Sequence, residues 1–220
     1  MPIKTLFFDV GNTLLFPDHE VMLYPLHQRG IFPSGHLLQR LERKTKHEFD
    51  SLQEKNPAID HGFWDIYYSH LLHELGLPDE AICVDLVTRT RVSGNWRDIR
   101  PHTREILLRL ARNYRLGVIS NADGKIAKIL TLCEIGDLFE TITDSGIVGK
   151  EKPHPAIFSA AVNSLGVVPE ESLYIGDIYS VDYLGSTRFG MQSVLFDVSG
   201  AYKDNGLPRV ESLEQLEALL

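Results

Sequence analysis

Hydrophobic and polar positions follow two different patterns along this chain of 220 residues. Near the start, and again from about residue 96 onward, short apolar runs alternate with amphipathic segments, whereas residues 16–95 show helical periodicity alone. An apolar run bounded by turn residues indicates a strand covered on both faces, as in a parallel sheet. Strands that alternate with helices are typical of the α/β class. The pattern therefore predicts a parallel sheet interrupted by a helical insertion.

The predicted strands are the apolar runs at residues 3–8, 115–119, 140–143, 172–175 and 193–196. Helices are predicted between them at 101–114, at 125–133 and from Pro155 to Leu165. The first strand belongs with the later ones because it has the same buried character. We therefore expect an α/β fold with a Rossmann-like parallel sheet core, residues 1–15 and 96–220, and an inserted α-helical cap, residues 16–95.

Four helices and no strand are expected in the insertion. The first runs from Glu20 to Gln28, the second follows Ser34, the third covers residues 62–75 and the fourth begins at Pro78. In the second helix an apolar stripe is formed by Leu37, Leu38, Leu41, Thr45 and Phe49. Charged residues fall elsewhere on this helix and are expected on its solvated face, and these are Arg40, Glu42, Arg43, Lys44 and Lys46.

The composition is that of an ordinary globular protein, with 43% hydrophobic and 24% charged residues. A formal net charge of -8 argues against a nucleic-acid-binding surface. The N-terminal residues show no basic segment followed by a long apolar stretch, and no apolar run has membrane-spanning length, so we expect a cytoplasmic protein without a signal peptide or membrane contact. Cys83 and Cys133 are expected to be small buried hydrophobes rather than a disulfide.

Polar groups suited to catalysis stand at the ends of the predicted strands. Asp9, Ser120 and Asp177 each follow an apolar strand, and Lys152 begins a helix between two of these strands. The carboxyl ends of parallel strands meet at one edge of a sheet, which is where open α/β proteins bind their ligands. We therefore expect these four residues to share one site, together with Asp182.

Four motifs, in their order along the chain, resemble those of the haloacid-dehalogenase-like hydrolase superfamily. They are FDVGNTL at residues 8–14, VISN at 118–121, Lys152-Pro153 ahead of a helix, and IGD at 175–177 followed by Asp182. Each motif is common, but the ordered set is specific. The resemblance covers residues 1–15 and 96–220, and the insertion resembles the helical cap that many family members carry at this place.

The resemblance implies a Mg2+-dependent phosphatase that acts on a small phosphorylated metabolite through an aspartyl-phosphate intermediate. Asp9 is the implied nucleophile, and Lys152 and Ser120 are the implied catalytic groups beside it. The implied ligands of the metal are Asp9, the Gly11 carbonyl, Asp177 and Asp182. The residues expected to contact the substrate phosphate are Thr13, Ser120, Asn121 and Lys152.

One position departs from the pattern of the family's phosphatases, which usually carry a second acid two residues after the nucleophile. Here that position is Gly11, which has no side chain to protonate the leaving oxygen. General acid catalysis typically contributes about 10²- to 10⁴-fold, so its loss slows a phosphatase without abolishing it. The loss is smallest for leaving groups that depart without a proton. Cap residues that offer a replacement acid are Asp18, His19, His47 and Asp65.

Other functions stay open on the same fold. Dehalogenases of the family also lack this acid, but they do not usually need the Gly-Asp of the fourth motif. Phosphonate-cleaving members use a cap lysine, for which the candidates are Lys44, Lys46 and Lys55. A binding module without turnover is the third alternative, although a scaffold has no use for the charged cluster.

His154 is expected at the surface, and His70 and His73 lack a third metal ligand. The sequence indicates neither the substrate nor the oligomeric state.

Overall fold

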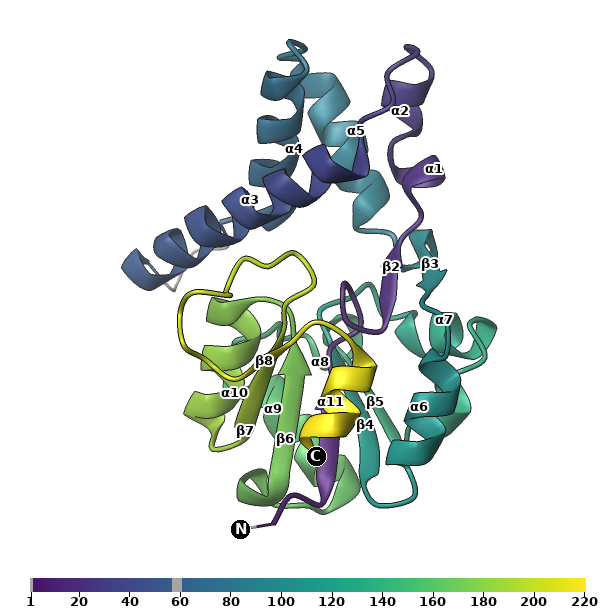
Figure 1. The fold of residues 1–220 in the computed structure, drawn as a ribbon, viewed down its shortest axis with the longest axis vertical. Coiled ribbons are helices and arrows are strands. Elements are labelled where there is room, and N and C mark those ends of the chain that lie inside the picture. The colour runs from purple at the N-terminus through teal and green to yellow at the C-terminus, as the bar shows by residue number, and fades with distance from the viewer. Residues whose placement is uncertain (1, 57–60) are drawn as a thin grey trace.

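The computed structural model describes residues 2–56 and 61–220. Its centre is a six-stranded sheet in the order β5-β4-β1-β6-β7-β8, in which every neighbouring pair is parallel (Figure 1). The strands are β1 (Thr5–Phe8), β4 (Arg115–Ser120), β5 (Thr141–Asp144), β6 (Ser172–Gly176), β7 (Gln192–Phe196) and β8 (Arg209–Val210). The predicted α/β class is confirmed. The sequence pattern does not predict β8, because two residues are too few to show a period.

Strand β1 lies in the middle of the sheet because its residues are apolar on both faces. Leu6 and Phe8 belong to the hydrophobic cluster on one face, together with Ile106. Phe7 belongs to the cluster on the other face, together with Phe158. The helices that contribute to the first cluster are α6 (Thr103–Leu110), α7 (Ile126–Leu132) and α11 (Leu213–Leu219). The second cluster is built on α9 (Pro155–Leu165), near the short helices α8 (Ser145–Val148) and α10 (Leu184–Phe189).

The carboxyl ends of the three central strands are level with one another. Phe8 is the partner of Val118 in β4 and of Ile175 in β6. The backbone N–H of Asp9 continues this ladder by donating to the Ile175 carbonyl at 2.8 Å. Ser120 and Asp177 each lie two residues beyond the partners of Phe8. The register therefore brings Asp9, Ser120 and Asp177 to the same edge of the sheet.

The helical insertion stands above this edge (Figure 1). Its helices are α1 (His19–Met22), α2 (Tyr24–His27), α3 (Gly35–Lys55), α4 (Phe63–Glu74) and α5 (Glu80–Thr90). They enclose a hydrophobic cluster of their own, which includes Leu26, Leu41 and Leu71. Where the chain enters and leaves the insertion, the antiparallel strands β2 (Leu15–Pro17) and β3 (Trp96–Ile99) pair with each other. The division into a core of residues 1–15 and 96–220 and a cap of residues 16–95 stays a prediction.

Two expectations for the insertion are wrong in detail. The single helix predicted over Glu20–Gln28 is two short helices, because α1 ends at Met22 and a new helix starts at Tyr24 with Pro25 in its first turn. The prediction that no strand occurs between residues 16 and 95 fails at Phe16 and Pro17, which belong to β2. That strand has three residues, and its pairing with β3 depends on a segment about eighty positions away along the chain.

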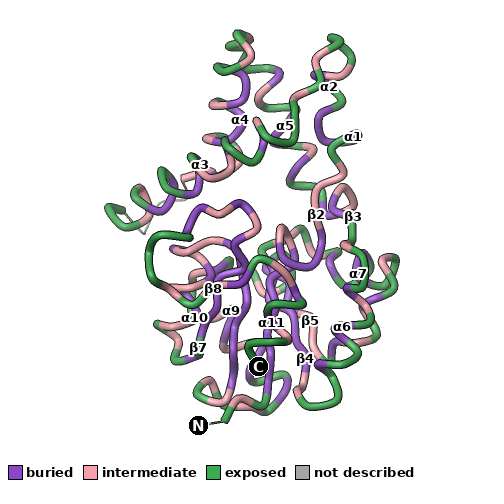
Figure 2. Tube along the Cα trace, in the orientation of Figure 1, coloured by how far each residue is buried: buried purple, intermediate pink, exposed green. Residues whose placement is uncertain are grey.

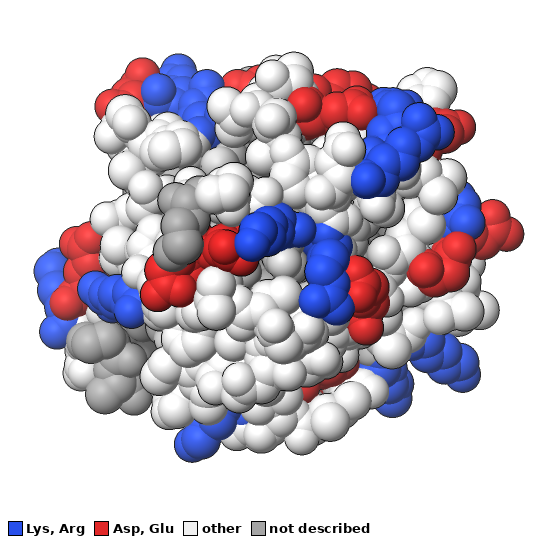
Figure 3. All heavy atoms as spheres, turned by 90° about the horizontal axis from the view of Figure 1, so that it is seen from below, with Lys and Arg blue, Asp and Glu red and all other residues white. Residues whose placement is uncertain are grey.

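The surface is mixed in charge. The face opposite the insertion carries interspersed acidic and basic side chains separated by uncharged areas (Figure 3). Ion pairs that join distant segments include Lys4 with Glu171 and Arg115 with Glu140. Among the described residues, no helix has both the length and the apolar character needed to cross a membrane. Cys83 and Cys133 are free thiols, but both are only half-buried, so the expectation of buried positions is wrong.

Candidate active site

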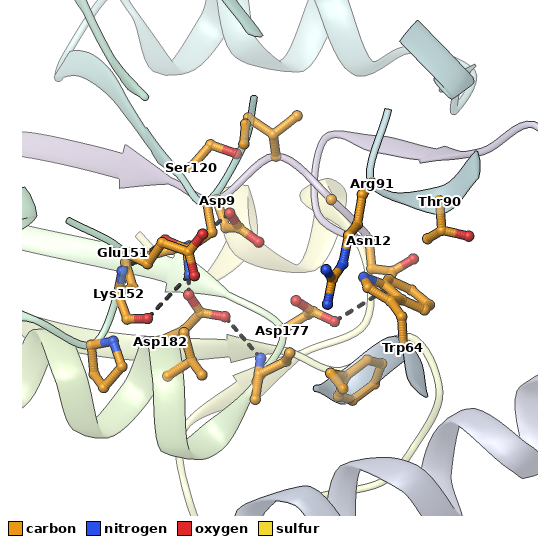
Figure 4. Close-up of a pocket in the computed structure, with 18 of the residues that line it drawn as sticks. Asp9, Asn12, Trp64, Thr90, Arg91, Ser120, Glu151, Lys152, Asp177 and Asp182 are labelled. Carbon is orange, nitrogen blue, oxygen red and sulfur yellow. Dashed lines mark hydrogen bonds and ion pairs between the residues drawn. The ribbon is translucent and has the colours of Figure 1, made fainter. Parts of the chain in front are cut away.

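A buried ammonium group joins the segments that the sequence predicts to meet. The Lys152 Nζ donates to Asp9 Oδ1 at 2.7 Å and to Asp182 Oδ1 at 2.8 Å (Figure 4). It also donates to the Tyr174 hydroxyl at 2.7 Å. The Lys152 side chain is 2% exposed, so water does not compete for these bonds. The electrostatic attraction is strong in such a dry environment, and the geometry fixes both carboxylates relative to the lysine.

The backbone around Lys152 is positioned by Asn121. The Asn121 side chain donates to the Lys152 carbonyl at 3.1 Å and accepts from the Lys152 N–H at 2.7 Å. This pair of bonds fastens the end of β4 to the segment that carries the lysine. Ser120 and Asn121 both line the cavity beside Asp9, as expected. The amide of Asn121 is occupied by the backbone, a role that the sequence does not predict.

Three carboxylates gather beside this lysine. Asp9, Asp177 and Asp182 each offer one oxygen within 4.8 Å of the others, and all three residues are buried. Burial raises the pKa of Asp9 to about 6, although Lys152 opposes the shift. Burial likewise raises the pKa of Asp177 to about 7, opposed by Lys46. The cluster therefore resists carrying three negative charges at once and favours a cation in its midst.

The bonding of each carboxylate shows which oxygens are available to such a cation. Asp182 uses both oxygens, because Oδ2 also accepts from the Ile178 N–H at 2.9 Å. Lys152 bonds to Asp9 Oδ1, and both Lys46 and Asn12 bond to Asp177 Oδ2, so none of these three side chains occupies Asp9 Oδ2 or Asp177 Oδ1. Two buried carboxylate oxygens beside a cavity suit Mg2+, which prefers oxygen ligands and retains several waters. The donor set therefore fits a magnesium ion.

A second buried ammonium comes from helix α3 of the insertion. The Lys46 Nζ lies 2.9 Å from Asp177 Oδ2 and 2.9 Å from Glu42 Oε1, and the side chain is 1% exposed. Burial by itself lowers the pKa of this lysine, but the charges of Asp177 and Glu42 raise it above its ordinary value. The expectation that Lys46 lies on a solvated face is wrong, because this side of α3 packs against the core.

The side of α3 that meets the core is polar along its length. Asp50 Oδ1 accepts from the Ser180 N–H at 3.0 Å, and Asp50 Oδ2 accepts from the Tyr202 hydroxyl at 2.8 Å. Three further contacts reach carbonyl groups in the loop after β7, namely Gln39 to Val198, Arg43 to Ser199 and His47 to Ala201. These contacts come from residues at helical spacing, namely 39, 43, 46, 47 and 50. This polar stripe is the sequence signal that identifies the side of α3 that packs against the core.

The acid cluster opens into a cavity of about 850 Å3 between the sheet edge and the insertion (Figure 4). From the insertion the cavity is lined by Phe49, Gln53, Gly62, Phe63, Trp64, Thr90, Arg91 and Ser93. The Trp96 ring lies against Gly11, where a β-carbon would stand 3.5 Å from the ring. Asn12 completes the turn in a left-handed conformation with φ of 53° and reaches Asp177 at 3.4 Å. Helix α3 thus lines the cavity with Phe49 and Gln53 and also contacts the core through Lys46 and Asp50. Buried and exposed residues alternate along this helix (Figure 2).

One residue expected at the phosphate lies elsewhere. Thr13 does not line this cavity, and its hydroxyl is buried without a hydrogen-bond partner among the described residues. Its side chain lines a smaller hollow beside Arg100 and Thr103. The turn after Asp9 directs Thr13 away from the acid cluster, so the structure does not support a phosphate contact from this residue.

The cap residues considered as replacement acids do not line the cavity either. Asp18 caps α1, His47 contacts the Ala201 carbonyl, and Asp65 forms an ion pair with Arg91 at 3.3 Å. Burial lowers the pKa of His19, whose side chain also lies outside the cavity lining. The sequence shows which cap residues are polar, but it does not show which of them face the cavity.

His154 and His70 have structural contacts. His154 is exposed as expected, although it also borders the cavity and caps α9 by accepting from the Ala156 N–H at 3.1 Å. His70 lies 2.8 Å from Glu48 and 3.1 Å from Lys44. Within residues 2–56 and 61–220, no group of three metal-ligating side chains includes His70 or His73.

Comparison with known proteins places these features in a family. A family model described as haloacid dehalogenase-like hydrolase matches residues 3–190. Glyceraldehyde 3-phosphate phosphatase from Pyrococcus abyssi is 30% identical over 202 residues, which cover 88% of this chain and 81% of that protein. Haloacid dehalogenase-like hydrolase domain-containing protein 3 from Mus musculus is 34% identical over 186 residues, which cover 81% and 74% respectively.

Solved structures share the fold. The HAD-hydrolase YfnB from Bacillus subtilis, in a crystal structure bound to magnesium, has a TM-score of 0.70 at 18% identity, covering 100% of this chain and 99% of that one. The L-2-haloacid dehalogenase RSc1362 has a TM-score of 0.66 at 20% identity, with the same coverage. At these identities the likeness shows the fold alone.

Proposed function

The chain belongs to the haloacid dehalogenase-like hydrolases, and from this premise we propose that it is a Mg2+-dependent phosphatase acting on a small phosphorylated metabolite. The observation that carries the proposal is the placement of Asp9. One oxygen of this carboxylate is held by Lys152, and Asp9 lines the cavity beside Asp177 and Asp182. The relatives named glyceraldehyde 3-phosphate phosphatase support a phosphate ester as the substrate.

In the proposed reaction Asp9 attacks the phosphorus atom. A bond forms between phosphorus and the carboxylate oxygen that Lys152 does not hold, and the bond from phosphorus to the leaving oxygen breaks, with the electron pair passing to that oxygen. A water oxygen then attacks the aspartyl phosphate. The bond to Asp9 breaks, the water's protons pass to phosphate and solvent, and inorganic phosphate and the carboxylate are released.

Positive charge must offset the approach of a carboxylate to a phosphate dianion. Lys152 supplies one charge and holds Asp9, while Ser120 and the following backbone amides donate to phosphate oxygens. Mg2+ would supply the remaining charge when bound, and Asp9, the Gly11 carbonyl and Asp177 would hold it, with Asp182 in an outer supporting role. Asp182 suits that outer role because both its oxygens already accept hydrogen bonds.

The alternative chemistries receive less support. A Schiff base requires an uncharged lysine facing the substrate, but Lys46 is paired with two carboxylates, and neither Lys44 nor Lys46 nor Lys55 lines the cavity. The dehalogenase neighbours share the fold at 18–24% identity, and similarity at this level does not show that they share the reaction. A binding module has no use for three buried carboxylates beside a cavity. Cytoplasmic location stays a prediction from the sequence.

The proposal is tested by assaying phosphate release with and without Mg2+. Asp9→Asn is expected to lower turnover by roughly 10⁴-fold or more, because an amide cannot form the covalent intermediate. Asp204→Asn, an exposed aspartate on the loop after β7, is the matched control and is expected to keep full activity. Circular dichroism and thermal melting verify that both variants fold. Turnover of Asp9→Asn near that of the wild type would remove Asp9 as the nucleophile.

A further inference from the structure

The cavity beside Asp9 offers little to protonate a leaving group. Asp9, Asp177 and Asp182 are engaged by the two buried lysines. The space next to Gly11 is bounded by the Trp96 ring, which has no proton to give at its face. A poor leaving group such as an alkoxide therefore meets an aromatic wall instead of an acid at this side of the nucleophile.

Two further acids among the described lining residues do not change this picture. Asp123 accepts from the Ser93 hydroxyl at 2.6 Å and from the Ser93 N–H at 3.4 Å. Burial alone raises the pKa of Asp123, but these bonds hold it below its ordinary value, so this carboxylate is ionised. Glu151 is exposed on the loop before Lys152. His154 is also exposed, and its Nδ1 faces its own helix.

The wall of the cavity formed by the insertion and by Trp96 of β3 is aromatic and continuous. The centroids of Phe49 and Phe63 lie 5.5 Å apart, those of Phe63 and Trp64 5.0 Å apart, and those of Trp64 and Trp96 5.6 Å apart. Separations of this size are those of edge-to-face and offset ring pairs. Trp64 is the least buried of the four rings, so part of its surface remains for a ligand. A planar aromatic ring can pack against the part of Trp64 that is not covered.

From these observations we propose that the substrate is an aryl phosphate, the phosphate ester of a phenol-like hydroxyl, with its ring packed on Trp64 and Trp96. This inference rests on the proposed phosphatase function. A phenol has a pKa of about 10, like that of tyrosine, whereas an aliphatic alcohol is close to water at about 15.7. A phenolate leaves with the electron pair of the broken P–O bond and takes its proton from solvent afterwards. The volume of about 850 Å3 accommodates a ligand of this size.

Two esters of similar size separate the alternatives, phenyl phosphate and cyclohexyl phosphate, each assayed with Mg2+. We expect kcat/KM to be higher for phenyl phosphate by about 10²- to 10⁴-fold, the contribution of the missing acid. A series of ring-substituted phenyl phosphates is expected to react faster as the pKa of the phenol falls. Equal rates for the two esters, or a rate independent of that pKa, would overturn the inference.

Gly11→Asp supplies the missing donor without altering the backbone carbonyl. The β-carbon would stand 3.5 Å from the Trp96 ring, which is an ordinary contact. We expect this variant to raise kcat/KM for cyclohexyl phosphate by at least tenfold relative to that for phenyl phosphate, so that the preference for the aryl ester narrows. Glu151→Gln is expected to change neither ester. A selective loss of cyclohexyl phosphate turnover in Glu151→Gln would identify Glu151 as an acid and contradict the inference.

The ring contact is tested separately by Trp64→Leu. We expect KM for phenyl phosphate to rise about tenfold while KM for acetyl phosphate, which has no ring, stays unchanged. Trp64→Phe is expected to restore most of the loss. An equal rise for both compounds would indicate a structural role for Trp64 and no ring site. If the wild-type protein hydrolyses none of phenyl phosphate, cyclohexyl phosphate and acetyl phosphate with Mg2+, the proposed phosphatase function itself fails. If it hydrolyses them without preferring the aryl ester, only this inference fails.

Discussion

The sheet edge and the core-facing side of α3 each contain a buried lysine that is paired with two carboxylates. At the sheet edge Lys152 lies between Asp9 and Asp182, and under α3 Lys46 lies between Asp177 and Glu42. Both ammonium groups are buried. Only Lys152 borders the cavity, whereas Lys46 approaches Asp177 from outside the cavity lining. The first lysine is therefore placed to meet a substrate, and the second joins the insertion to the acid cluster.

The difference shows that a buried ion pair can serve either the reaction or the packing of one part of the fold on another. Two charges withdrawn from water add little net stability by themselves, but removing one partner leaves an uncompensated charge. At the sheet edge this charge is available to a substrate phosphate. Under α3 it links the position of the insertion to Asp177. Variants that change one lysine at a time separate these two consequences.

The largest expected effect on activity is at the sheet edge. Lys152→Met removes the cation beside Asp9, and we expect kcat to fall by roughly 10²- to 10³-fold because a preorganised charge at the phosphate is lost. Steady-state kinetics with a phosphate ester and Mg2+ measure the change. Retention of at least half the wild-type kcat would show that Lys152 serves the fold and not the reaction.

The corresponding change under α3 is expected to affect stability first. Lys46→Met leaves Asp177 and Glu42 without their shared partner, and we expect the free energy of unfolding to fall by about 3–5 kcal/mol. Urea denaturation measures it. Lys44→Met is the matched control, because Lys44 is an exposed lysine on the same helix, and a change within about 0.5 kcal/mol is expected there. Equal effects of the two variants would contradict the buried role of Lys46.

A smaller effect is expected on metal binding. Burial raises the pKa values of Asp9 and Asp177 to about 6 and about 7, so at pH 6 a bound proton must leave before Mg2+ binds. At pH 8 both groups are ionised, and we expect the Mg2+ affinity to be about tenfold higher. Calorimetry in buffers of different ionisation enthalpy counts the protons released. An affinity that is the same at both pH values, with no proton release, would disagree with these pKa directions.

The smallest effect concerns the outer end of the polar stripe on α3. Gln39→Ala removes one hydrogen bond to the Val198 carbonyl, 3.2 Å long and solvent-exposed, and we expect a loss of about 1 kcal/mol in the free energy of unfolding. Urea denaturation again provides the measurement. A loss in the free energy of unfolding as large as that of Lys46→Met would mean that the contacts of the polar stripe break together. Lys46 would then contribute no more than Gln39.

Most of the sheet-edge site can be predicted from the sequence for a topological reason. A parallel sheet places the carboxyl ends of its strands together, so Asp9, Ser120 and Asp177 meet once their strands are recognised. Thr13 is the exception. It follows Asp9 by four residues, but a left-handed Asn12 turns the chain between them, and a turn conformation is not visible in a hydrophobic pattern.

The sequence by itself determined the alternation of strands and helices, the helical insertion, and the order of the charged residues along the chain. These depend on local periodicity, which each segment carries within itself. Only the tertiary structure decided that Lys46 is buried, that Trp96 covers Gly11 and that Thr13 faces another hollow. Each of these depends on which surface packs against a residue, and that surface comes from segments far away in the sequence.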